Sequence, residues 1–212
     1  MNYHPFFYIL FFYAYLSPFQ CWSSSYTYLS ILNGEKTNTQ WTLHEDANKI
    51  EVSGQNRGND VKLKYSQAFD LHYFIEKEPK DQLFEIQREG TNLSVKNQEK
   101  VKVLSIGNTP WIQEFKFGFK PFLTSKKQEI SFVIVYKKDT TIHDMTATKE
   151  KIERIIINEK PYETQKLKIT LKGFKKRFWK AEAWFDLETK LLVKYRSNEG
   201  PGTPYVEVTL IK

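Results

Sequence analysis

The four histidines are the residues that would most readily supply a general base or a metal ligand near neutral pH. They are His4, His44, His72 and His143. His4 lies in an apolar N-terminal stretch, and the other three are isolated, with no second histidine, cysteine or carboxylate cluster at ligand spacing. The pattern predicts neither a metal site nor histidine-based catalysis, and we expect no cofactor.

The short motifs that hold nucleophiles, phosphates or zinc are also absent. The sequence has no G-x-S-x-G, no glycine-rich phosphate loop, no H-E-x-x-H and no S-x-x-K. Asp186 follows two aromatic residues, and a hairpin turn accounts for an aspartate there. An enzyme built from scattered residues, such as His72 and His143 meeting in a cleft, is therefore the least favoured of three functions that we consider.

One segment, Lys172–Lys180 (KGFKKRFWK), alternates cations with aromatic rings. This pattern suits attraction to phosphate or stacking on bases. We do not expect nucleic acid as the partner, because the N-terminus indicates export. The hypothesis is a patch that meets an anionic membrane surface, and the alternative is a solvated hairpin tip. The residues of this patch are Lys172, Lys175, Lys176, Arg177 and Lys180.

The net charge of +7 is concentrated in the C-terminal part of the chain. Residues 1–125 carry 13 basic and 13 acidic residues, whereas residues 126–212 carry 19 and 12. Such asymmetry is typical of proteins that bind an acidic partner or an anionic surface. Lysine-rich strand faces and edges, which oppose aggregation, offer a simpler explanation.

Alternation of apolar and polar residues with period two dominates the chain after Tyr26, and turn pairs such as Asn33-Gly34 separate the segments. The expected fold is all-β, a single curved antiparallel sheet or incomplete barrel. One short helix is expected at Pro121–Lys127. We expect Glu114–Phe119 to form a strand, and Ile130–Tyr136, apolar on both faces, to be a central strand.

A strand near the C-terminus carries two small residues between two large rings on one face, in the order Trp179, Ala181, Ala183, Phe185. Packing across the interface explains such gaps, and so does room for an apolar guest on a curved sheet. The candidate lining of a cavity on the concave face is Trp111, Phe115, Phe117, Phe132, Ile134, Trp179, Ala181, Ala183 and Phe185.

The first 23 residues contain no Lys, Arg, Asp or Glu, and Phe6–Leu16 is continuously apolar. The apolar run is too short for a spanning helix and suits a signal peptide cleaved after Ser23. Residues 24–212 would then form one β domain without cysteine. Two alternatives for this segment are lipidation of Cys21 and an uncleaved membrane anchor. Gln20 and Pro18 argue against lipidation, and the short apolar run argues against an anchor.

The C-terminal residues also carry a resemblance. The order W-x-A-x-A-W-F-D (Trp179–Asp186), L-L-V-K-Y (Leu191–Tyr195) and G-P-G-T-P (Gly200–Pro204) resembles uncharacterised exported bacterial β proteins. The predicted sheet is similar to the lipoprotein-carrier and lipoprotein-receptor folds (LolA/LolB-like). This resemblance implies a periplasmic or cell-envelope location and handling of a lipid or another apolar group. It supplies no catalytic residues.

We therefore expect a non-catalytic exported protein of the periplasm or cell envelope that binds a lipid or other apolar ligand on a concave sheet face. The alternative is a structural or adaptor protein of the envelope that binds a protein partner through an exposed edge strand. The first function requires an internal void, and the second requires a filled core and an unpaired edge.

Overall fold

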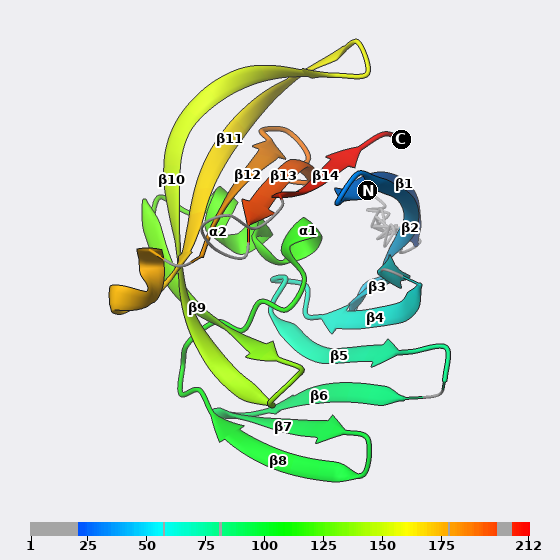
Figure 1. Cartoon of the computed structure of the whole chain (residues 1–212), viewed down its shortest axis with the longest axis vertical. Coiled ribbons are helices and arrows are strands. Elements are labelled where there is room, and N and C mark those ends of the chain that lie inside the picture. Colours follow the sequence, from blue (N-terminus) through cyan, green and yellow to red (C-terminus); the bar gives the residue numbers. More distant parts are fainter. Residues whose placement is uncertain (1–20, 57, 81, 178, 199–204) are drawn as a thin grey trace, which may run out of the picture.

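The computed structural model describes residues 21–212 except 57, 81, 178 and 199–204. It forms one curved antiparallel sheet of 14 strands, so the all-β expectation is confirmed (Figure 1). The strands are β1 Trp22–Leu32, β2 Glu35–Glu45, β3 Ile50–Asn56, β4 Asn59–Tyr65, β5 Leu71–Lys77, β6 Leu83–Glu89, β7 Asn92–Asn97, β8 Lys100–Ser105, β9 Glu129–Tyr136, β10 Thr141–Ile157, β11 Lys160–Leu171, β12 Lys180–Asp186, β13 Leu192–Asn198 and β14 Tyr205–Leu210.

The strand order shows how the chain builds this sheet. It runs β8-β7-β6-β5-β4-β3-β2-β1-β14-β13-β12-β11-β10-β9, so the described chain begins in the middle at β1 and winds to the β8 edge. It then crosses to the opposite edge at β9 and winds back until β14 pairs with β1. Tight turns suffice for the hairpins, and Asn33 and Gly34 have the positive φ angles of 54° and 82° that such turns require.

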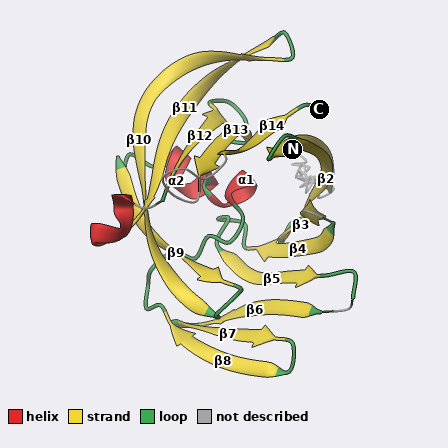
Figure 2. Cartoon of the chain, in the orientation of Figure 1, coloured by secondary structure: helices red, strands yellow, loops and turns green. Residues whose placement is uncertain are grey.

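The crossing segment contains two helical turns, α1 (Phe115–Gly118) and α2 (Lys120–Thr124). Figure 2 shows both in red on the concave side of the sheet, whereas the third helical segment, η1 (Gly173–Arg177), lies outside it. The short helix expected near Pro121 is confirmed, with Pro121 in its first turn. No helix in the described part of the chain is long and apolar enough to cross a membrane.

The strand expected at Glu114–Phe119 is wrong, because this segment forms α1. The Glu114 side chain accepts a hydrogen bond from the Lys116 backbone N–H at 3.1 Å and so caps the helix. Phe115 and Phe119, four residues apart, pack together with ring centroids at 5.4 Å. Over six residues, alternating aromatic side chains are compatible with the period of a strand and with that of a helix. Burial of this segment on the concave side of the sheet favours the helix.

The central position expected for Ile130–Tyr136 is also wrong, because β9 is an edge strand. Its open edge is covered by the crossing chain. The Val133 N–H donates to the Pro110 carbonyl at 2.9 Å, and the Ile112 N–H donates to the Val133 carbonyl at 3.0 Å. The crossing segment therefore takes the place of a neighbouring strand at the open edge of β9.

The core lies between the concave face of the sheet and the crossing segment. Gly54 on β3 stands opposite Trp41 on β2, and the indole lies over it so closely that a Cβ there would be 2.5 Å from the ring. Gly118 is equally constrained, since a Cβ would lie 2.7 Å from the Ile112 side chain. Glycine at these two positions lets the aromatic layer and α1 approach the backbone.

Candidate functional site

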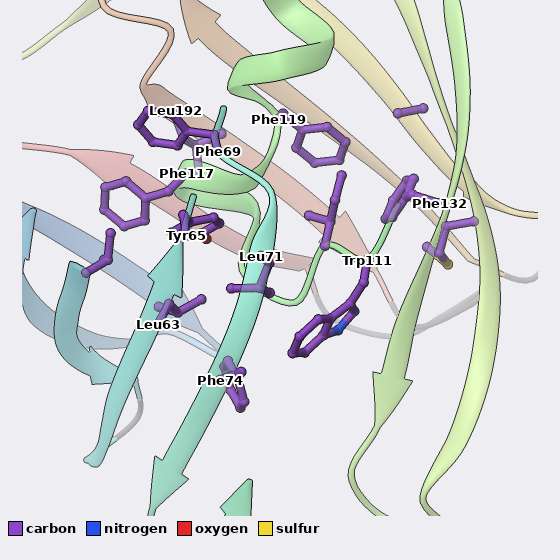
Figure 3. Close-up of a cluster of buried hydrophobic side chains, with 14 of the residues drawn as sticks. Leu63, Tyr65, Phe69, Leu71, Phe74, Trp111, Phe117, Phe119, Phe132 and Leu192 are labelled. Atoms are coloured by element: carbon purple, nitrogen blue, oxygen red, sulfur yellow. The ribbon is translucent and has the colours of Figure 1, made fainter. Parts of the chain in front are cut away.

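The aromatic residues of α1 and α2 fill much of the concave interior (Figure 3). Phe117 packs on Trp41 with ring centroids at 5.7 Å, and Phe119 packs edge-on against Phe132 at 5.3 Å and Phe185 at 5.7 Å. Six of the nine expected lining residues are at most 3% exposed and form this core: Trp111, Phe117, Phe132, Ala181, Ala183 and Phe185. The small alanines of β12 thus lie in the filled part of the interior.

A cavity of about 190 Å³ remains between α1 and the strands β9, β13 and β14. Phe115 and Ile134 of the expected set line it. Its other apolar walls are Leu192, Tyr195 and Val208, and the Phe115 and Tyr195 rings are in contact at 6.1 Å. The structure therefore retains an apolar space, smaller than the nine-residue set implied.

A second, more polar pocket of about 400 Å³ adjoins the first. Lys116 and Val208 line both pockets, so the two spaces meet at these side chains. The walls of the second pocket are otherwise mostly hydroxyl, amide and carboxylate groups from β1, β2 and β3. They are Ser30, Leu32, Glu35, Thr37, Thr39 and Asn56. An apolar chamber thus opens beside a polar one, with a cation at the boundary.

Lys116 has its own partners inside the curve. Its ammonium lies 3.0 Å from the Glu114 carboxylate, and the two side chains are 11% and 12% exposed. The same ammonium lies 4.5 Å from the centroid of the Trp41 ring and 5.6 Å from that of Tyr28. The carboxylate and the ring faces offset part of the cost of placing this charge away from water.

Two buried phenols complete the polar part of the interior. The hydroxyls of Tyr28 and Tyr65 have no hydrogen-bond partner among the described residues. Burial raises the pKa of both phenols well above the ordinary value, and the nearby Glu114 carboxylate raises each pKa further. Both are therefore neutral donors at any physiological pH. Unpaired buried hydroxyls are costly, and a bound polar group or water near them would be stabilised.

Trp179, the ninth expected lining residue, lies elsewhere. It lines a large hollow of about 880 Å³ together with Lys172, Arg177 and Lys180 of the expected basic patch. The side chains of Lys175 and Lys176 fall outside the described residues. The patch and the apolar cavity are therefore separate features of the molecule.

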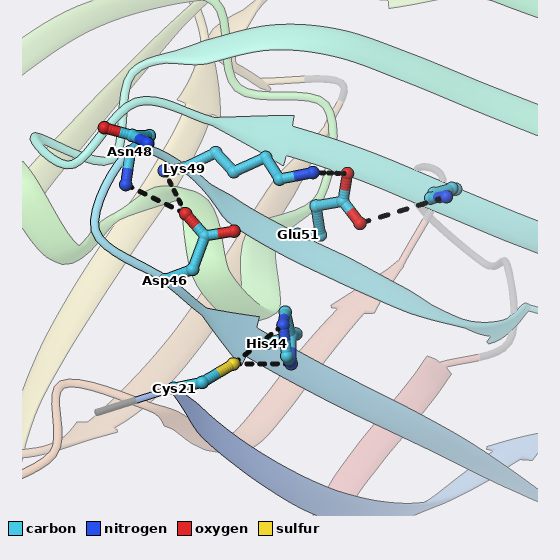
Figure 4. A network of polar contacts seen from close by, with 7 residues as sticks. Cys21, His44, Asp46, Asn48, Lys49 and Glu51 are labelled. Carbon is cyan, nitrogen blue, oxygen red and sulfur yellow. Dashed lines mark hydrogen bonds and ion pairs between the residues drawn. The ribbon is translucent and has the colours of Figure 1, made fainter. Parts of the chain in front are cut away.

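The three histidines within the described residues occupy different environments, and His4 lies outside those residues. His72 is exposed on β5, and His143 stacks on Tyr136 with ring centroids at 5.1 Å. His44 lies beside Cys21, with Sγ 3.1 Å from Nε2, next to a turn that Asp46 closes through the backbone N–H groups of Asn48 and Lys49 (Figure 4). In the described residues no three His, Cys, Asp or Glu side chains gather to hold a metal ion.

Comparison with solved structures places this architecture among known folds. A beta-barrel-like protein with a domain of unknown function (DUF1849) from Brucella abortus superposes with a TM-score of 0.59 at 8% identity, over 90% of this chain and 95% of that chain. The chain shares the fold of this Brucella protein. The resemblance to uncharacterised β-sheet proteins is thereby confirmed at the level of the fold.

Two further structures are similar at lower TM-scores. The hypothetical lipoprotein YmcC from Escherichia coli gives 0.41 at 13% identity, over 89% of this chain and 86% of that chain. A LolA superfamily protein from Nitrosomonas europaea gives 0.28 at 7% identity, over 92% and 86%. No protein-family model and no curated protein matches the chain.

Sequence reasoning missed the residues at the heart of the site. Glu114 and Lys116 stood in a segment interpreted as a strand, where they would have been exposed on its polar side. The pairing of Cys21 with His44 was missed because Cys21 was assigned to the leader. The sequence does carry one indication of the helix. Glu114 directly precedes the aromatic segment and Lys116 follows two residues later, a pattern that fits a capped helical turn.

Proposed function

We propose that this is a non-catalytic protein that binds a lipid-like, amphipathic ligand on the concave side of its sheet. The carrying observation is that the apolar cavity and the polar pocket meet at Lys116. An acyl chain would lie against Phe115, Ile134 and Val208, and an anionic head group would face the Lys116 ammonium.

The sizes of the two spaces suit such a ligand. Sites for small molecules occupy roughly 300–1,000 Å³. The 190 Å³ cavity alone is smaller than this range, whereas the cavity and the adjoining 400 Å³ pocket together fall within it. Burial of an alkyl chain contributes about 0.8 kcal/mol per methylene before the cost of ordering the ligand. Affinity would therefore come from the tail, and Lys116 would select the charge of the head.

We further propose that the protein is exported and acts in the periplasm or cell envelope as residues 24–212, after removal of a signal peptide of about 23 residues. The uncharged apolar leader in the sequence supports this location. The proposed role requires no bond to be made or broken, so a ligand recovered from the protein would be chemically unchanged. His72 lies on β5 and His143 lies on β10, where it stacks on Tyr136, and neither residue has a role in the proposed binding.

Titration of residues 24–212 with palmitate and with lysophosphatidylglycerol, followed by native mass spectrometry, tests this proposal. We expect 1:1 complexes and a loss of binding in Val208→Phe, which fills the cavity. Val103→Phe adds the same bulk at a side chain that is 64% exposed and serves as the control. Equal binding by Val208→Phe and wild type, or no binding by either ligand, would overturn the proposal.

A second candidate function rests on the β8 edge. No strand pairs with the outer side of β8 in the described residues, and its Val101 and Val103 are 65% and 64% exposed. Such an edge can accept a strand from a protein partner in the envelope. Val103→Pro would abolish that pairing and leave lipid binding intact, and co-purification of an envelope protein with wild type but not with Val103→Pro would favour this role.

A further inference from the structure

A hollow of about 880 Å³ has no part in the proposed lipid site. Lys168 and Lys180 line it, whereas their strand neighbours Ile169 and Ala181 are buried in the core. Because side chains alternate across a sheet, the hollow lies on the convex face of β10 to β14. The segment η1, outside the sheet in Figure 2, contributes Gly173 and Arg177 to it.

Three lysines of this hollow have no carboxylate partner in the part of the chain that the structure describes. Lys168, Lys172 and Lys180 form no ion pair with any described residue, whereas the neighbouring Lys166 pairs with both Glu150, at 3.4 Å, and Glu182. The carboxylates that also line the hollow are already engaged. Glu150 holds Lys166, and Glu129 accepts a hydrogen bond from the Thr148 hydroxyl at 3.1 Å.

Aromatic rings and hydroxyls accompany these charges. Trp179 and Tyr205 line the hollow, and the Arg196 guanidinium lies 4.1 Å from the centroid of the Tyr205 ring. Thr146 and Thr170, which face each other across β10 and β11, add hydroxyls beside Lys180, the partner of Thr170 on β12. The surface therefore combines lysines that form no ion pair with the described residues, hydroxyls and ring faces.

We propose that this hollow binds an anionic oligosaccharide, that is, sugar rings that carry carboxylate or phosphate groups. The lysines would meet the anionic groups through charge-assisted hydrogen bonds. The threonines would bond ring hydroxyls, and Trp179 would pack against the apolar face of a ring. A chain or compact ligand fits a hollow better than a flat bilayer does, because a bilayer would meet the projecting η1, where Phe174 is 71% exposed, before the lysines.

Isothermal titration of residues 24–212 with trigalacturonate tests the proposal, with uncharged maltotriose and phosphatidylglycerol vesicles as the comparison ligands. We expect trigalacturonate to bind, with affinity that falls steeply with added salt. Lys168→Gln/Lys180→Gln should weaken it by about a hundredfold, since each charge-assisted bond contributes about tenfold. Lys96→Gln/Lys100→Gln makes the same charge change on β7 and β8 and should have little effect.

The other outcomes overturn the proposal. If maltotriose binds as tightly as trigalacturonate, the charges of the ligand do not contribute to recognition. If the two double variants lose the same affinity for trigalacturonate, binding responds only to the net charge of the protein. Binding to vesicles alone, abolished by Phe174→Ala, would assign the basic patch to a membrane surface instead. The result is independent of the lipid site, because Val208→Phe closes that cavity without touching the convex face.

Discussion

The side-chain amide of Gln113 bonds to Val135 as a neighbouring strand would. Its amide nitrogen Nε2 donates to the Val135 carbonyl at 2.9 Å, and its Oε1 accepts from the Val135 N–H at 3.0 Å. The same Oε1 accepts from the Trp111 indole at 3.1 Å. This amide extends the backbone pairing of the crossing segment along the edge of β9. It protects an apolar edge and holds α1 in place beside the cavity.

Replacement of Gln113 by leucine should lower the free energy of unfolding by about 2 kcal/mol. The change leaves the N–H and carbonyl of Val135 without partners in a partly buried place. Urea denaturation measures the effect, with Gln128→Leu at an exposed position as the control. An unchanged urea midpoint for Gln113→Leu would show that the edge does not depend on this amide.

Lys116→Met should cost about 3–5 kcal/mol, because it leaves the nearly buried Glu114 carboxylate without its cation. Glu114→Gln combined with Lys116→Met removes both charges and should regain much of that loss. A double-mutant cycle from thermal or urea unfolding gives the coupling between the two residues. Additive effects of the single changes would mean that the ion pair contributes nothing to stability.

Gly54→Ala should destabilise the sheet by about 1–3 kcal/mol. The new Cβ would lie 2.6 Å from the Gln40 carbonyl oxygen as well as against the Trp41 ring, and a backbone atom cannot move aside cheaply. Near-ultraviolet circular dichroism should report the displaced indole. Trp41→Leu in the same background tests the cause, since removal of the ring should reduce the additional cost of the alanine.

Glu153 should make stability depend on pH in the acid range. Hydrogen bonds from Lys151 and from the Trp184 indole, both at 2.7 Å, lower the pKa of this carboxyl below its ordinary value of 4.5. A lowered pKa in the folded state stabilises the protein above the unfolded pKa, and this contribution disappears as the pH falls through the folded value.

Glu153→Gln should therefore reduce stability at pH 7 and reduce its decline between about pH 5 and pH 3. Urea midpoints measured across this range give the comparison. Glu163→Gln, whose parent carboxylate is 62% exposed and 3.9 Å from Arg154, is the matched control. The same pH profile for Glu153→Gln and wild type would contradict the assigned role.

Several features could be predicted from the sequence because local patterns determine them. Period-two alternation and glycine turns such as Asn33-Gly34 specify consecutive hairpins, and consecutive hairpins specify an antiparallel sheet. The pattern also separated the faces of β11, where Leu167 and Ile169 are buried and Lys168 is exposed. These are interactions between neighbours in sequence, so a single strand or turn suffices to show them.

The candidate site was decided only by the tertiary structure. The helical state of Phe115–Gly118 depends on partners far along the chain, such as Trp41, Phe132 and Tyr195. The sequence by itself determined a curved β protein with an aromatic interior. Close packing between distant segments decides which rings fill that interior and where a cavity remains beside Lys116. No local sequence pattern specifies how the volumes of side chains from distant segments fit together.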